Sequence, residues 1–399
     1  MTSPEPLRVL TFTSLYPNAE QPGQGLFVAE RLRHLRASGR IQATVVAPVP
    51  WFPSRSRRFG RYGAYARVPA CEEQEGMSVH HPRWLAIPAI GMSIAPALMA
   101  AGARASVEAL RDRVDVIDAH YFYPDGVAAA ALGRKLRKPV VITARGTDLN
   151  LIPQHALPRK QIQRAAREAA GLVTVSEALR ERLVDLGIER ERVQVLRNGV
   201  DLARFAPAAD REDLRRRLGL SGIVLLAAGN LVREKDHALA IAALAVLPDA
   251  TLLVAGDGPL RAELEQHAAR AGVAARARFL GGVPQAALIE YYNAADALVL
   301  TSRREGMPNV VLEALACGTP VVATRVGGVP ELIDSEIAGR LVDATSDGVA
   351  AGVRALVAAP PSRAGTRRHA ERFGWDATTQ GQIELFTRVV ARAANGESA

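Results

Sequence analysis

The sequence has little of what marks a secreted or disulfide-stabilised protein. Its 399 residues include only two cysteines, Cys71 and Cys317, so a disulfide framework is excluded and a reducing, cytoplasmic compartment is expected. The first residues lack a basic segment followed by an apolar one, and we expect no secretory signal there. Aromatic residues are also scarce, at 5%, so alanine, valine and leucine must fill the cores.

Long apolar segments are scarce too. Residues 85–103 are uncharged, but proline and glycine interrupt them and they are barely long enough to cross a bilayer. We therefore expect a turn followed by a half-buried helix, which could lie at a membrane interface. No short repeat and no low-complexity stretch occurs.

Acidic residues are outnumbered in only one half of the chain. Residues 1–200 contain 28 Lys and Arg against 18 Asp and Glu, a net charge of +10, whereas residues 201–399 contain 22 against 23, a net charge of −1. Such an excess indicates phosphorylated substrates, an anionic membrane surface or nucleic acid. The chain has no zinc-ligand spacing, no RNA-binding aromatic motif and no recognition-helix pattern, so we do not expect nucleic acid.

The basic excess is densest in residues 51–70, which contain five arginines and no acid. The arginines are Arg55, Arg57, Arg58, Arg61 and Arg67, and the aromatic residues between them are Trp51, Phe52, Phe59, Tyr62 and Tyr65. We expect the surrounding residues 50–84 to be irregular. One interpretation is an ordinary solvated loop. The other is a membrane-facing loop, because aromatic rings and arginines favour the headgroup layer of anionic lipid.

Strand and helix patterns alternate through both halves of the chain. Strands are expected at 8–13, 43–47, 114–119, 139–143, 172–175, 193–196, 223–228, 251–255, 297–300 and 320–324, and helices at 26–35, 124–136, 177–186, 236–247, 260–271, 285–294 and 375–393. This alternation favours parallel sheets. Because it stops at the sequence N-G-V-D after Arg197 and then starts again, it predicts two Rossmann-like α/β domains, at residues 1–200 and 201–375.

Polar residues with clear chemistry follow several strands. In the first half these are His120, Arg145 and Asp148, and ligands of parallel sheets bind at the carboxyl ends of strands. The alternative for His120 is a structural histidine. In the second half, Arg233 and Lys235 follow a strand. Lysine is informative because 46 of the 50 basic residues are arginine. A lysine here suggests a compact charge for a phosphate group.

A third group lies in residues 301–332, which read as strand, loop, helix and strand. Glu305 lies in the loop, the helix begins near Pro308, and Glu313 follows within that helix. A helix N-terminus suits phosphate, and carboxylates accept hydrogen bonds from sugar hydroxyls. The combination predicts a nucleotide-sugar site. The alternative is an ordinary core unit with a solvated Glu305.

The sequence of this stretch resembles the E-x₇-E segment of retaining glycosyltransferases of family 4, also called group 1. It reads E-G-M-P-N-V-V-L-E-A-L-A-C-G-T-P-V-V-A-T. The N-G-V-D sequence resembles the hinge of the same family. The resemblance implies the GT-B fold, with two Rossmann-like domains and a cleft between them, and a C-terminal helix, 376–399, that crosses back to the first domain. It also implies a nucleoside diphosphate sugar as donor, UDP rather than GDP, with no cofactor.

The resemblance also implies roles for individual residues. Glu305 would bind sugar hydroxyls and Glu313 the ribose, while Arg233 and Lys235 would bind the donor diphosphate and act in catalysis with Glu305. The other residues placed at the substrates are Gly25, His120, Arg145, Asp148, Asn198, Gly229, Val283, Gly306, Met307, Pro308, Asn309 and Val310. No D-x-D motif occurs, so no metal is expected. Many relatives have histidine where this chain has Arg145. A role of the backbone carbonyl would be kept here, whereas a role that needs an imidazole would be absent or would move to His120.

The segments G-L-F-V-A-E-R-L and D-A-H-Y-F-Y-P-D-G resemble family members of bacterial polysaccharide assembly. They imply a saccharide acceptor, lipid-linked, and an enzyme at the inner face of the cell membrane. The alternatives are a GT-B sugar-nucleotide epimerase or phosphorylase, or a non-catalytic subunit that binds a sugar nucleotide.

Overall fold

A computed structural model describes residues 5–86 and 91–396, and the chain divides into two compact units. Unit 1 contains Met1–Asn198 and Trp375–Ala399, and unit 2 contains Gly199–Gly374. The turn expected at the start of residues 85–103 falls partly on residues 87–90, outside the described residues. The same holds for the last three residues of the expected C-terminal helix.

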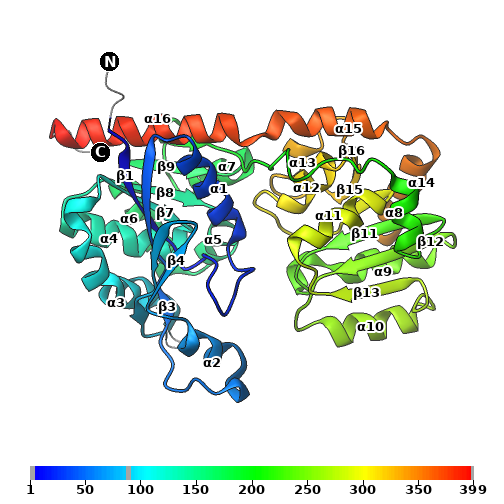
Figure 1. The fold of residues 1–399 in the computed structure, drawn as a ribbon, viewed down its shortest axis with the longest axis horizontal. Helices are drawn as coiled ribbons and strands as arrows, with labels where there is room; N and C mark the ends of the chain where they lie inside the picture. The colour runs from blue at the N-terminus through cyan, green and yellow to red at the C-terminus, as the bar shows by residue number, and fades with distance from the viewer. Residues whose placement is uncertain (1–4, 87–90, 397–399) are drawn as a thin grey trace. The chain divides into compact units, whose positions relative to one another are not determined.

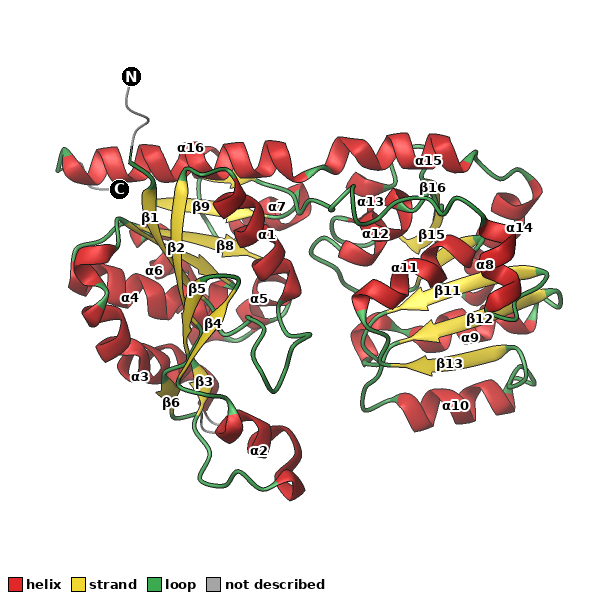
Figure 2. Cartoon of the chain, in the orientation of Figure 1, coloured by secondary structure: helices red, strands yellow, loops and turns green. Residues whose placement is uncertain are grey.

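Unit 1 is built on an eight-stranded sheet with helices on both faces (Figures 1 and 2). In the order of the sheet, its strands are β10 (Val193–Val195), β9 (Gly171–Thr174), β8 (Val140–Ala144), β7 (Val116–His120), β1 (Leu7–Phe12), β2 (Ile41–Val46), β5 (Met77–His80) and β4 (Cys71–Gln74). All neighbours are parallel except β4 and β5. The central strands β7 and β8 are buried along their whole length, as expected for parallel strands covered on both faces.

The helices of unit 1 are α1 (Leu26–Ala37), α2 (Gly60–Arg67), α3 (Ala95–Ala109), α4 (Val127–Leu136), α5 (Thr147–Asn150), α6 (Ala156–Glu168), α7 (Glu177–Asp185) and α16 (Trp375–Ala394). Helices α1 and α16 share one core with the sheet. In that core, Leu32 of α1 and Phe386 of α16 pack with Val9, Val116 and Val141 of the strands. The last helix of the chain is therefore part of the core of unit 1.

The prediction that residues 50–84 are irregular was wrong. They contain α2, a two-stranded pair of β3 (Val49–Pro50) and β6 (Arg83–Trp84), and the β4–β5 hairpin. The hairpin was missed because β4 is a polar edge strand of sequence C-E-E-Q, which lacks the apolar pattern of a core strand. Of the two strands, only β5 alternates apolar with polar residues, and its apolar residues Met77 and Val79 are buried.

Unit 2 is built on a six-stranded, wholly parallel sheet. In the order of the sheet, its strands are β13 (Ala277–Gly281), β12 (Ala250–Ala255), β11 (Ile223–Ala228), β14 (Ala297–Leu300), β15 (Val321–Thr324) and β16 (Gly339–Val342). Its helices are α8 (Arg211–Arg217), α9 (His237–Ala245), α10 (Arg261–Arg270), α11 (Gln285–Ala294), α12 (Asn309–Ala316), α13 (Val329–Leu332), α14 (Ser346–Ala358) and α15 (Arg363–Ala370). The predicted fold class, two Rossmann-like α/β domains, is confirmed.

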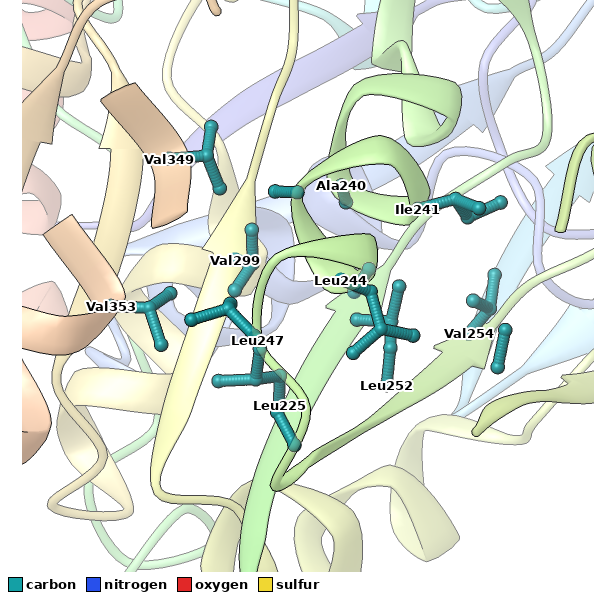
Figure 3. Close-up of a cluster of buried hydrophobic side chains, with 14 of the residues drawn as sticks. Leu225, Ala240, Ile241, Leu244, Leu247, Leu252, Val254, Val299, Val349 and Val353 are labelled. Atoms are coloured by element: carbon teal, nitrogen blue, oxygen red, sulfur yellow. The ribbon is translucent and has the colours of Figure 1, made fainter. Parts of the chain in front are cut away.

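The core of unit 2 consists of small and branched apolar residues, as the scarcity of aromatics requires. Leu244 of α9 and Val353 of α14 pack with Leu225, Leu252 and Val299 of the strands (Figure 3). The two helices therefore cover the same face of the sheet.

Each sheet has one point at which the strand order reverses. In unit 2 the chain continues from β11 to one side and returns at β14, which pairs with the other edge of β11. In unit 1 the corresponding neighbours are β1 and β7. In open α/β sheets, ligands bind outside the carboxyl ends of strands at such a point. The loops after these four strands are therefore where each unit is expected to bind a ligand.

None of the helices in the described parts of the chain combines the length and the apolar composition that a membrane span requires.

Candidate active site

The clearest polar pair of unit 2 lies at its reversal point. Lys235 follows β11 in a short helical turn, Arg233–Lys235, and Glu305 follows β14. The Nζ atom of Lys235 lies 2.6 Å from Oε1 of Glu305, and the Oγ atom of Ser302 donates to the same oxygen over 2.6 Å. The Glu305 side chain is 9% exposed, so its charge needs these donors. The structure thus brings together two residues that are 70 positions apart in the sequence.

Further bonds join the loops after β11 and β14. The backbone N–H of Arg303 donates to the carbonyl of Glu234 over 2.8 Å, and the Arg303 side chain pairs with Asp236 at 2.7 Å. The hydroxyl of Thr301 donates to the carbonyl of Asp236 over 2.8 Å. These bonds fix the position of Lys235 relative to Glu305.

The second predicted carboxylate, Glu313, lies within α12 and is almost fully buried. Its Oε1 accepts from Nε2 of Gln285 and its Oε2 from the hydroxyl of Tyr292, each over 2.7 Å. Burial and the neighbouring Glu313 raise the pKa of Tyr292 well above its ordinary value, so the phenol stays protonated and donates. Sequence reasoning missed Gln285 and Tyr292, because nothing in the pattern of α11 distinguishes them from other residues of an amphipathic helix.

The helix after Glu305 begins one residue later than predicted. Pro308 has extended backbone angles and is the N-cap, so α12 starts at Asn309. The preceding residues Gly306 and Met307 are buried. A glycine is required nearby at Gly327, where an added Cβ would lie 2.0 Å from the carbonyl oxygen of Glu305. The backbone of Glu305 is therefore closely packed against the backbone of Gly327.

The remaining predicted residues of unit 2 lie in the same group of strand-end loops. Gly229 directly follows β11, and Arg233 is exposed at the start of the turn that ends in Lys235. Val283 is half-buried in the loop between β13 and α11, two residues before Gln285. Asn309 and Val310 form the first turn of α12.

In unit 1, Asp148 has a different position from the one expected of a substrate ligand. Its side chain is fully buried and accepts hydrogen bonds from the backbone N–H groups of Phe122, Arg145 and Gly146. The carboxylate shapes the loops after β7 and β8, and direct contact with a substrate is not expected of it.

His120 and Arg145, by contrast, form a pair at the ends of these strands. Nη2 of Arg145 donates to Nδ1 of His120 over 2.7 Å, and Nε2 of His120 donates to Asp118 over 2.9 Å. Burial lowers the pKa of His120 to about 4, so the imidazole is neutral. Nη1 of Arg145 donates to Oδ1 of Asn198 over 2.8 Å. Both ring nitrogens of His120 are hydrogen-bonded within the unit, and Arg145 links His120 to Asn198.

The pair is connected to the C-terminal helix by buried side chains. Nε2 of Gln382 in α16 donates to Oδ2 of Asp118 over 3.0 Å, and Nε of Arg31 in α1 donates to Oε1 of Gln382. Arg31, Asp118 and Gln382 are each 0–1% exposed. Sequence reasoning missed all three, because Gln382 and Asp118 are 264 positions apart and each lies in an otherwise ordinary element.

The loop after β1 contains Gly25, the N-cap of α1. Its φ of 66° is left-handed, and an added Cβ would lie 2.1 Å from the carbonyl oxygen of Leu15, so only glycine fits. The same loop is bound by Asp125, a fully buried carboxylate that accepts from the backbone N–H and the hydroxyl of Ser14. Burial raises the pKa of Asp125 to about 7.

In residues 5–86 and 91–396, no three His, Cys, Asp or Glu side chains are grouped in a way that could bind a metal ion.

The sequence matches two known families, one for each unit. Residues 210–373 match the family described as glycosyl transferases group 1, and residues 23–204 match glycosyltransferase family 4. Among similar proteins, a Bacillus subtilis protein provisionally named a teichuronic acid biosynthesis glycosyltransferase is 34% identical, over 82% of this chain and 83% of that protein. A D-inositol 3-phosphate glycosyltransferase of Geodermatophilus obscurus is 32% identical, over 96% of this chain and 89% of that protein.

Solved structures with the same fold have lower sequence identity. The sucrose-phosphate synthase of Thermosynechococcus elongatus has a TM-score of 0.78 at 19% identity, covering 97% of this chain and all of that one. The Anabaena protein HepE, solved with UDP and glucose, has a TM-score of 0.73 at 20% identity, covering 96% of this chain and all of that one. At such identity the likeness establishes the fold.

Proposed function

Because this chain belongs to family 4 of the glycosyltransferases, also called group 1, and is an enzyme of the GT-B fold, we propose that it transfers a hexose from a nucleoside diphosphate sugar to a saccharide acceptor, with retention of the anomeric configuration. UDP is the proposed nucleotide. The names of the similar proteins, which concern teichuronic acid and D-inositol 3-phosphate, support a role in the synthesis of polysaccharide or another glycoconjugate.

The observation that carries this proposal is the Lys235–Glu305 ion pair, 2.6 Å long, at the reversal point of the unit 2 sheet. A bound sugar nucleotide needs a cation beside its phosphates and a carboxylate that accepts hydrogen bonds from its sugar hydroxyls. Here both groups are already in contact at the edge of the sheet where a ligand is expected. Arg233 adds a second, exposed cation in the same turn.

The proposed chemistry follows from these groups. Glu305 accepts hydrogen bonds from hydroxyls of the donor sugar, and Glu313, oriented by Gln285 and Tyr292, accepts from the ribose. Arg233 and Lys235 stabilise the negative charge that develops on the diphosphate as the bond from the anomeric carbon to phosphate oxygen breaks. The acceptor oxygen bonds to the same face of that carbon, and its proton passes to the departing diphosphate.

We assign the acceptor to unit 1, with Arg145 and His120 at the loops that would contact it. The net charge of +10 in residues 1–200 suits an acceptor that carries a lipid phosphate. The enzyme would then act on a lipid-linked saccharide, in the cytoplasm and at an anionic membrane surface.

A donor screen tests the proposal. UDP- and GDP-sugars are first ranked by the rise in melting temperature that each causes, and the best donor is then assayed for release of free nucleoside diphosphate with a lipid-linked saccharide fraction. We expect release that depends on the acceptor and survives EDTA, because no D-x-D motif occurs and cations take the part of a metal.

The alternatives give different outcomes in the same assay. Isomerised donor without release indicates an epimerase, release that requires inorganic phosphate indicates a phosphorylase, and binding without turnover indicates a non-catalytic subunit. Loss of activity in EDTA with recovery in Mn²⁺ would contradict the proposed role of Arg233 and Lys235.

A further inference from the structure

Most of the exposed large apolar side chains in the described parts of the chain lie in one part of unit 1. Nine such side chains are exposed in the described parts of the chain, and six of them lie between residues 51 and 94. These six are Trp51, Phe59, Tyr62, Leu85, Met92 and Ile94. Trp51 is 52% exposed, which is unusual for the largest apolar side chain in a sequence with so few aromatics. A cluster of this kind marks an interaction surface.

The cluster is formed by segments that bond to one another. Strand β3 pairs with β6, and the backbone N–H of Trp51 donates to the carbonyl of Trp84 over 2.7 Å, so Trp51 is bonded to the strand that Leu85 follows. Phe52 lies 5.3 Å from Phe59 and 5.5 Å from Tyr62, measured between ring centres. The rings therefore form one group that joins α2 to the β3–β6 pair.

Further exposed apolar side chains lie where α6 contacts the short turn that precedes α3. Nε2 of Gln161 donates to the carbonyl of Ser93 over 2.9 Å, so α6 contacts the short turn that exposes Met92 and Ile94. Leu157 lies four residues before Gln161, on the same face of the helix, and is 50% exposed. With Leu157, seven of the nine exposed apolar side chains in the described parts of the chain lie in unit 1.

Five arginines lie among these aromatic residues, and residues 51–70 contain no acidic residue. Arg55, Arg57, Arg58 and Arg61 are exposed, whereas Arg67 pairs with Glu20 at 2.6 Å. The guanidinium carbons of Arg58 and Arg61 lie 4.8 Å and 5.1 Å from the ring centres of Phe59 and Tyr62. Cations over rings make a surface that is apolar and positively charged at the same positions.

We infer that one surface of unit 1 inserts its rings and aliphatic side chains into the headgroup layer of an anionic lipid bilayer. Its exposed apolar residues are Trp51, Phe59, Tyr62, Leu85, Met92 and Ile94. Tryptophan and tyrosine favour the boundary between headgroups and acyl chains, and arginine favours anionic headgroups while its methylenes cover apolar surface. Helix α2 projects from the sheet, so the surface can approach a flat partner (Figures 1 and 2). A soluble polyanion would engage the arginines but would not cover Trp51, Leu85 and Ile94.

This inference deepens the membrane partner proposed above, but it can be tested without any substrate. Full-length protein is mixed with sedimenting vesicles of phosphatidylcholine alone or with about one third phosphatidylglycerol. We expect binding to the anionic vesicles only. Replacing Arg55, Arg57, Arg58 and Arg61 with serine should weaken binding at least tenfold, because each cation near an anionic surface contributes about a fivefold gain.

A control variant separates this surface from bulk charge. Serine at Arg111, Arg113, Arg182 and Arg388, all exposed in unit 1, removes the same four charges and should leave vesicle binding within twofold. A second variant, Trp51→Ser with Leu85→Ser, keeps every charge and should also lose binding. Equal loss in the control, or no loss in the two surface variants, would overturn the inference.

Tryptophan emission tests insertion directly, because the three tryptophans are Trp51, Trp84 and Trp375. Anionic vesicles should shift the emission to shorter wavelength, and Trp51→Phe should remove most of that shift. Soluble heparin should leave the emission unchanged. A shift that persists in Trp51→Phe, or one that heparin reproduces, would contradict insertion. The rise in melting temperature that the best donor causes, measured without lipid, serves as the folding control for every variant, so failure here leaves the proposed reaction untouched.

Discussion

Among single residues, Lys235 has the most specific proposed role. It is one of only four lysines, and its ammonium group contacts the one carboxylate that follows β14. Lys235→Ala should lower the turnover number more than tenfold, since a lost hydrogen bond to a charged group costs about 1.5–3 kcal/mol. Arg233→Ala should have a similar effect. Steady-state kinetics with the best donor measures both.

Arg304 offers a control for the loss of a cation. It lies in the same loop as Glu305 and pairs with Glu234 at 3.5 Å, with 40% of its side chain exposed. Arg304→Ala should stay within threefold of the natural enzyme. Normal turnover in both the Lys235 and Arg233 variants would show that neither cation acts on the diphosphate.

The sequence allowed some of these residues to be anticipated and not others. Glu305 and Lys235 could be found because each follows an apolar strand, and the carboxyl ends of parallel strands meet at one edge. Asp148 satisfied the same rule, yet its oxygens bind backbone N–H groups. A strand-end position does not distinguish a carboxylate that shapes a loop from one that binds a ligand, because the two differ only in backbone conformation.

Among the elements, α16 contributes buried hydrogen bonds as well as apolar contacts to unit 1. Gln382→Leu would remove both bonds of the buried amide, one to Asp118 and one from Arg31. We expect a loss of roughly 1.5–3 kcal/mol in the free energy of unfolding for each lost hydrogen bond to a charged group. Urea unfolding followed by tryptophan emission measures this in unit 1, because all three tryptophans lie there.

The matched substitution on the same helix is Gln380→Leu. Gln380 is exposed and donates to Glu384 within α16. Its replacement should change the urea midpoint by a small fraction of the Gln382 effect. Equal midpoints for the two variants would show that the buried bonds contribute nothing to stability.

Element prediction succeeded where a strand is buried on both faces. The apolar runs of β8, β11 and β14 were located to within a residue or two. It failed at the polar edge strand β4 and at α6, where the buried stripe of Pro158, Ile162, Ala165 and Ala166 contains only one large branched apolar residue. Edge and surface elements gain their stability from contacts that no local pattern encodes.

For the whole molecule, stability should depend on pH through Asp125. Its carboxyl has an ordinary pKa of 3.8 when unfolded and a pKa of about 7 in the fold, so between these values the folded protein binds a proton that the unfolded chain has lost. The contribution of Asp125 to stability therefore falls as the pH rises through this range, by up to about 1.4 kcal/mol per pH unit. It is fully present only below pH 3.8.

Asp125→Asn isolates this contribution, because the amide still accepts from Ser14 and does not titrate. The difference in the free energy of unfolding between the natural protein and the variant should decrease from pH 4.5 to pH 7 and then level off. Tryptophan-detected urea titrations at several pH values give that difference. A constant difference across the range would mean that Asp125 stays ionised in the fold.

The division of unit 1 between the two ends of the chain has a consequence for biosynthesis. Residues of unit 2 are contiguous, so all of them leave the ribosome before α16 does. Ile383, Phe386 and Val389, which complete the core of unit 1, emerge last. The part of the unit 1 sheet that α16 covers therefore stays exposed until all of unit 2 has been synthesised. A nascent chain arrested before residue 375 should expose that part of the sheet to chaperones, and release of the last helix should end their binding.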